Sequence, residues 1–131
     1  MKVKFLWKKV RTLDYKEQNP EQLKMYFYAV LIPSILSKEL FKRNSDIKEL
    51  VDKFKVKNKI KDYLYISRTA LLAKLIREIE EIEIEMLQYN VQTFKEYIED
   101  LLITKELINN ESANVTKIIN KYSRNHSEKQ K

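Results

Sequence analysis

Residues 67–103 read SRTALLAKLIREIEEIEIEMLQYNVQTFKEYIEDLLI, and they indicate most clearly that this chain is helical. Apolar residues recur there at spacings of three and four, which places them on one face of an α-helix. Neither glycine nor proline interrupts the pattern, so it favours long helices. A first series consists of Leu72, Leu75, Ile79, Ile82, Met86 and Tyr89, and a second of Val91, Phe94, Ile98, Leu101, Lys105 and Ile108.

The two series lose their common phase at Asn90, where a continuous helix would turn its apolar face away from the core. Thr93 followed by Glu96 also matches a capping box, which starts a helix. We therefore predict a helix from Ser67 to about Tyr89, a break at residues 90–92 and a helix from Thr93 to about Asn109. A short connection favours antiparallel packing of the two, and a single bent helix is the alternative.

Upstream, Asn19-Pro20 is a strong helix start, because Asn caps, Pro suits the first helical position and Gln22 can complete a capping box. This helix should reach about Ile32. Proline lacks a backbone donor and clashes with the preceding turn, so we expect a kink or break at Pro33 and a second piece from Ser34 to about Lys42.

Three shorter elements complete the prediction. A helix over residues 46–54 would be capped by Asn44-Ser45, and a last short helix would cover residues 113–122. Residues 2–7 alternate lysine with apolar residues and can form a short strand. The predicted fold is all-α: a compact bundle of four to six helices, with or without one short β element at the N-terminus. It forms a single domain over residues 1–122, followed by a disordered polar tail over residues 123–131.

Composition excludes most familiar catalytic designs. The chain has no glycine and no cysteine, and its one histidine is His126. Phosphate-cradling loops and nucleophile elbows need glycine, whereas thiolate zinc sites and thiol catalysis need cysteine. We therefore expect no enzymatic activity, no cofactor and no metal. The acidic run is expected to be a solvated helix face; it comprises Glu78, Glu80, Glu81, Glu83 and Glu85.

Neither membrane insertion nor secretion is expected. The most apolar stretch, residues 25–36, is interrupted by Pro33 and is shorter than the roughly 20 residues that a membrane span needs. We therefore expect no integral membrane segment. The absence of cysteine fits a reducing compartment, and the N-terminal residues lack the features of a secretory signal, so we expect an intracellular protein.

Charge is unevenly distributed along the chain, whose formal net charge is +7. Residues 1–66 carry 16 basic and 8 acidic side chains, residues 67–110 carry 5 and 9, and residues 111–131 carry 5 and 2. Basic blocks attract polyanions such as nucleic acid, and they also keep a protein in solution.

The densest basic block is residues 53–61, KFKVKNKIK, with a lysine at every second position. An exposed basic strand and a basic loop both fit this pattern. Aromatic residues lie among lysines around Trp7 and near residues 63–65. Because single-strand binders combine basic grooves with stacking rings, Trp7 is the leading candidate for base stacking.

Residues 66–72, ISRTALL, resemble the start of the second helix in ribbon-helix-helix or helix-turn-helix DNA-binding proteins. In that setting a capping serine and an arginine can meet phosphate at the helix N-terminus, which makes Arg68 a further candidate. The sequence departs from both patterns. Too few residues separate the lysine run from Ser67 for the ribbon family, and residues 56–66 are long for the turn of a helix-turn-helix.

Two hypotheses of function follow. The leading one is a small, basic, non-enzymatic protein that binds the backbone of DNA or RNA, such as an accessory protein of a virus or mobile element. Its candidate contacts are Lys2, Lys4, Trp7, Lys8, Lys9, Arg11, Lys53, Lys55, Lys57, Lys59, Lys61 and Arg68. The alternative is a helical protein-interaction module, a subunit, adaptor or inhibitor, that meets a protein partner or a second copy through its heptad series. Its interface would comprise Leu72, Leu75, Ile79, Ile82 and Met86.

Overall fold

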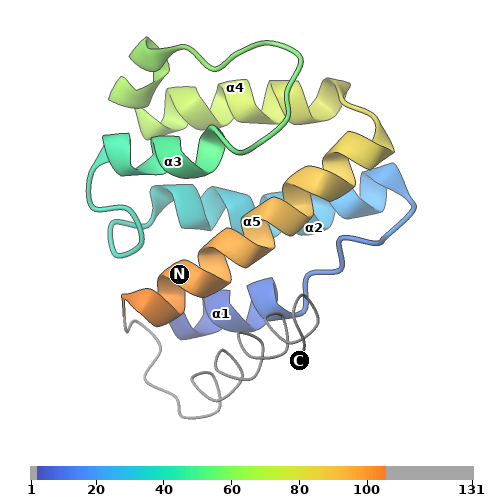
Figure 1. Cartoon of the computed structure of the whole chain (residues 1–131), viewed down its shortest axis with the longest axis horizontal. Coiled ribbons are helices and arrows are strands. Elements are labelled where there is room, and N and C mark those ends of the chain that lie inside the picture. The colour runs from blue at the N-terminus through green and yellow to red at the C-terminus, as the bar shows by residue number, and fades with distance from the viewer. Residues whose placement is uncertain (1–2, 106–131) are drawn as a thin grey trace, which may run out of the picture.

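A computed structural model describes residues 3–105, which form a compact all-α fold (Figure 1). The predicted fold class is thereby confirmed. The α-helices are α1 (Val3–Arg11), α2 (Pro20–Leu36), α3 (Lys48–Val51), α4 (Arg68–Glu81) and α5 (Ile84–Thr104). Two short 3₁₀ segments, η1 (Asn44–Ile47) and η2 (Asp62–Ile66), flank α3 and precede α4. The helix predicted over residues 113–122 and the tail over residues 123–131 lie outside the described residues.

Helix α2 packs against α1, α4 and α5, and α5 crosses over it in Figure 1. Phe27 of α2 is fully buried at this crossing. Its ring meets Phe94 of α5 at 5.4 Å and Phe54, which follows α3, at 6.1 Å, both edge to face. Edge-to-face aromatic pairs add to the stabilisation from buried area. Residues from three separate segments therefore share one core.

The N-terminal strand is a wrong prediction, because residues 3–11 form α1. Leu6, Trp7 and Val10 are buried, whereas Lys8 and Lys9 are exposed. The spacing of the buried residues follows a helical face that packs against α2 and α5. Alternation over residues 2–5 alone was too short to distinguish a strand from one turn of helix.

Helix α2 starts as predicted: the Asn19 side chain accepts a hydrogen bond from the Gln22 amide at 3.0 Å. The predicted break at Pro33, with a second piece to about Lys42, is wrong, because the helix continues through Pro33 and ends at Leu36. Proline's fixed φ is helical, and the carbonyl that loses its donor belongs to Ala29, which is exposed. Water can therefore reach the unpaired carbonyl, while Ile35 beyond the proline stays in the core.

The start of α4 is also as predicted, since the Ser67 hydroxyl accepts a hydrogen bond from the Ala70 amide at 3.2 Å. The predicted break at residues 90–92 is wrong. The chain turns at Ile82 and Glu83, whose backbones are extended, and α5 then runs without interruption past Asn90. The fully buried face of α5 consists of Leu87, Val91, Phe94, Ile98 and Leu102. These residues keep one helical phase, so the apparent phase shift came from assigning Met86 and Tyr89 to the core.

Candidate functional site

Residues 53–61, hereafter the lysine segment, form a loop that links α3 to η2. The open choice between strand and loop is thereby settled. Phe54 and Ile60 are buried, with 8% and 6% of their surface exposed, and Val56 is partly buried. All five lysines are exposed. The alternating pattern thus divides the segment into an apolar side that packs on the core and a lysine side that faces solvent.

The buried amide of Asn90 on α5 holds the backbone of the lysine segment. The Lys55 amide donates to the Asn90 side-chain oxygen at 2.7 Å, and the Asn90 side-chain nitrogen donates to the Lys55 carbonyl at 2.9 Å. Asn90 is only 1% exposed. One side chain therefore satisfies both backbone groups of a loop residue, which explains why a polar residue lies within α5.

The carboxylate of Glu78 on α4 forms a second attachment. It accepts hydrogen bonds from the Asn58 backbone amide at 3.0 Å and from the Asn58 side chain at 3.1 Å. The ammonium group of Lys74, one turn earlier on α4, lies 3.1 Å from the Glu78 carboxylate. Glu78 is 2% exposed, so the prediction that the whole acidic run is a solvated face is wrong at this residue. Its charge belongs inside the fold because three donors surround it.

The surroundings of Glu78 determine whether its carboxyl group is ionised in the folded protein. Burial by itself raises the pKa of this carboxyl, but the hydrogen bonds from Asn58 and the charge of Lys74 together outweigh it. The pKa of Glu78 therefore lies below its ordinary value. The carboxylate form, which accepts from both donors of Asn58, is the stable one at neutral pH.

The carboxylates near the lysine segment pair with another residue or lie beyond ion-pair distance, as Glu83 and Glu85 do in the hollow that Lys55 and Lys57 border. The nearby carboxylates of Asp52 and Asp62 pair with Lys48, at 3.4 and 3.2 Å. Over residues 3–105, no carboxylate lies within ion-pair distance of any of the five lysine ammonium groups. The Lys55 ammonium instead lies 4.2 Å from the centre of the Tyr89 ring. The nine residues thus present five positive charges to solvent, and the loop is attached to α5 at Lys55 and to α4 at Asn58.

A second basic cluster lies on α1 and is separate from the first. Lys8, Lys9 and Arg11 are exposed, and the Lys9 and Arg11 side chains lie over the rings of Phe5 and Trp7. Figure 1 shows α1 at the lower edge of the molecule, whereas the segment between α3 and η2 runs from the middle of the view to the upper edge. The two basic segments therefore belong to different parts of the fold. Lys2 lies outside the described residues, and Lys4 is described only as part of the α1 backbone.

Trp7 and Arg68 are not placed for the roles expected of them. Trp7 is 7% exposed and packs in the core, so its ring is not free to stack on a base. Arg68 is 8% exposed, and its guanidinium donates to the carbonyls of Ile35, Ser37 and Phe41 and to the Asn44 side chain. Four of its five N–H donors are used at the C-terminal end of α2 and in the residues that follow, so this buried group is not placed to meet a phosphate. Both residues are removed from the candidate contacts.

The predicted protein-interaction surface is also occupied. Leu72, Leu75 and Ile79 on α4 are buried in the core. Ile82, at the turn between α4 and α5, is also buried, and Met86 is partly buried against the core. These residues hold the monomer together, so the heptad series does not present a free apolar face. Reasoning from sequence missed Asn90, Glu78 and Tyr89, which contact the lysine segment. The signal available was a polar residue interrupting a buried helical face, which we interpreted as a break.

Within residues 3–105, no cluster of His, Cys, Asp and Glu side chains could hold a metal ion, and no helix is long and apolar enough to cross a membrane. Comparisons with protein-family models, with curated proteins and with solved structures found no match for this chain.

Proposed function

We propose that this protein binds the phosphate backbone of nucleic acid through the lysine segment. One observation carries the proposal: five exposed lysines without carboxylate partners project from a loop whose backbone is attached to two helices. Lysines act here as point charges that neutralise phosphates without reading bases, so binding is driven by counterion release. We propose no catalytic role.

The attachment of the loop supports this function. A flexible chain loses conformational freedom when it binds, and that loss weakens the complex. In this protein Phe54 and Ile60 are packed in the core, and the backbones of Lys55 and Asn58 are hydrogen-bonded to buried side chains. Folding has therefore already restricted the backbone that carries the lysines, and the remaining cost of binding falls mainly on their side chains.

Three matched triple variants test which basic surface binds. The first replaces Lys57, Lys59 and Lys61 with Gln, the second replaces Lys8, Lys9 and Arg11, and the third replaces Lys38, Lys42 and Arg77 as a control. Each removes three exposed positive charges and lowers the net charge equally. Affinity for a fluorescent single strand of about 16 nucleotides is measured by anisotropy in about 50 mM salt.

The proposal predicts that the lysine-segment variant loses the most affinity and that the control variant loses the least. Equal losses in all three variants would mean that only the net charge matters, and the lysine segment would not be the site. Absence of binding by the wild-type protein in about 50 mM salt would overturn the function itself.

A further inference from the structure

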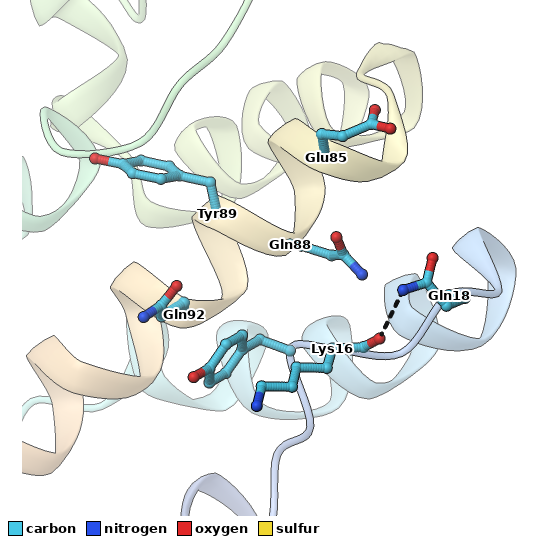
Figure 2. Close-up of a pocket in the computed structure, with 7 residues that line it drawn as sticks. Lys16, Gln18, Glu85, Gln88, Tyr89 and Gln92 are labelled. Atoms are coloured by element: carbon cyan, nitrogen blue, oxygen red, sulfur yellow. Dashed lines mark hydrogen bonds between the residues drawn. The ribbon is translucent and has the colours of Figure 1, made fainter.

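Tyr89, on the exposed side of α5, stands between two hollows. One, of about 370 Å³, is bordered by Lys55 and Lys57 of the lysine segment and by Ile82, Glu83, Glu85, Met86 and Tyr89. The other, of about 400 Å³, lies between α5 and the loop that leads into α2 (Figure 2). We call the second the glutamine hollow. It is lined by Tyr15, Gln18, Glu85, Gln88, Tyr89 and Gln92, together with Lys16.

The glutamine hollow is rich in hydrogen-bond acceptors. The side-chain nitrogen of Gln88 donates to the Glu17 carbonyl at 2.9 Å, and that of Gln92 donates to the Glu96 carboxylate at 3.2 Å. A carbonyl and a carboxylate only accept, so the nitrogen of each amide must face its partner and the orientation of the amide is fixed.

The amide oxygens are therefore acceptors without a partner, and each amide nitrogen keeps one further N–H. No donor over residues 3–105 reaches the side-chain oxygens of Gln88 and Gln92. Figure 2 shows the Gln88 nitrogen turned toward Gln18 and its oxygen turned away from that residue. The Glu85 carboxylate adds a third acceptor group. A ligand with N–H donors can use these acceptors, while the Lys16 ammonium, which also lines the hollow, supplies donors.

We propose that the glutamine hollow takes one unstacked base of a single-stranded nucleic acid, and that it favours bases with an exocyclic amino group. Tyr15 and Tyr89 supply aromatic surface, and the amide oxygens and Glu85 accept from the amino group, as carboxylates and amides do with cytosine and adenine. The inference rests on the proposed function, since the lysine segment supplies the phosphate contacts.

Position links the two sites. Lys55 lies over the Tyr89 ring at 4.2 Å and borders the first hollow, while the same tyrosine lines the glutamine hollow. A strand whose phosphates lie along the lysine segment therefore passes a stacking ring at the edge of a site for one base. Base pairs in a duplex keep their bases stacked inside, so a duplex cannot use this site without flipping a base out.

Three single strands of about 16 nucleotides separate the contributions: oligo(dC), oligo(dT) and an abasic strand of equal length. All three carry the same phosphates. Cytosine has an amino donor where thymine has a carbonyl acceptor, so they present opposite groups to the amide oxygens. We expect oligo(dC) to bind tighter than oligo(dT), and both to bind tighter than the abasic strand, in anisotropy titrations at one salt concentration.

Two variants locate the effect. Tyr89→Ala is expected to weaken oligo(dC) binding about 5- to 150-fold, the range that one stacked base contributes, and to weaken abasic binding much less, because only Lys55 of the lysine segment contacts the ring. Tyr26→Ala is the matched control, because Tyr26 and Tyr89 are both 41% exposed. Gln92→Leu, which removes an acceptor without touching the ring, is expected to reduce the preference for oligo(dC) over oligo(dT).

The outcomes distinguish this inference from the proposed function. Equal affinities for all three strands, with Tyr89→Ala unchanged, would overturn the base site and leave phosphate binding by the lysine segment intact. Preference for oligo(dT) would overturn the acceptor argument. Absence of binding to every strand would overturn both the proposed function and the base site.

Discussion

Replacing Asn90 with Ala removes the attachment of the lysine segment to α5. Two hydrogen bonds are lost, at 2.7 and 2.9 Å, and the backbone N–H and carbonyl of Lys55 lose their partner. A polar group left without a partner in the protein costs about 1–3 kcal/mol. Lys55 is exposed, so water partly replaces the amide, and we expect about 2–4 kcal/mol for the two groups together.

Helix propensity opposes part of this loss. Alanine is a better helix former than asparagine by at most about 0.7 kcal/mol. The expected net loss is therefore about 1.3–4 kcal/mol of the free energy of unfolding, measured by urea denaturation with circular dichroism. Hydrogen exchange should also show that the amide of Lys55 loses protection, while the amide of Asn58, which Glu78 holds, and amides in α2 keep theirs.

Gln92→Ala is the matched control on the same helix. Its side-chain amide donates only to the exposed Glu96 one turn later, an interaction worth a few tenths of a kcal/mol. Equal stability losses in the two variants, each below about 0.5 kcal/mol, would refute the view that Asn90 holds the loop. A loss of stability without any change in exchange at Lys55 would place the role of Asn90 within α5 alone.

Three further predictions concern buried polar groups. The pKa of Glu78 lies below its ordinary value of 4.5, so ionised Glu78 stabilises the fold above that pH, and this stabilisation is lost as the pH falls through the lower pKa of the folded state. Urea denaturation across this pH range should show the loss of stability, and Glu78→Gln should make stability depend less on pH. Arg68→Lys cannot reproduce the forked contacts at the end of α2 and should cost at least about 2 kcal/mol in urea denaturation, whereas a cost below about 0.5 kcal/mol would contradict this role. Burial raises the pKa of Tyr65 to about 12, and its hydroxyl has no hydrogen-bond partner over residues 3–105, so Tyr65→Phe should not destabilise the protein at neutral pH. It should also reduce the loss of stability as the pH rises from 10 toward 12, which denaturation at alkaline pH measures.

Local signals in the sequence were sufficient for the fold class and for several helix ends. The caps at Asn19 and Ser67 are interactions between a side chain and an amide three residues later, so they can be recognised without knowledge of the rest of the fold. The exposure of the lysines at residues 53–61 follows from their charge, because unpaired lysines are almost never buried.

The corner between α4 and α5 could not be located in this way. Ile82 and Glu83 include neither glycine nor proline, and Glu83 makes no side-chain capping hydrogen bond. The turn is imposed by packing, with Ile82 buried at the corner and Leu87 facing the core in place of Met86. At Asn90, a buried polar residue and a helix break give the same sequence pattern, and only the position of Lys55 distinguishes them.

Some features of the candidate site could likewise be predicted from the sequence, and others could not. Lysine exposure was predictable, whereas the burial of Trp7 and Arg68 depends on tertiary contacts with α2 and α5 or with the residues after α2. An arginine at a helix start can meet a phosphate or close a neighbouring helix, and the sequence around it is the same in both cases.

The salt dependence of binding tests the central claim most directly. If all five lysines of the segment contact phosphates of a duplex, affinity should fall about 500-fold between about 50 and 200 mM salt, because log K changes by roughly 0.9 per contact for each tenfold change in salt. With Lys57, Lys59 and Lys61 replaced by Gln, two contacts remain and the fall should be about 12-fold. A variant that keeps the wild-type slope would contradict the account, since the lost lysines would then not be the groups that meet phosphate.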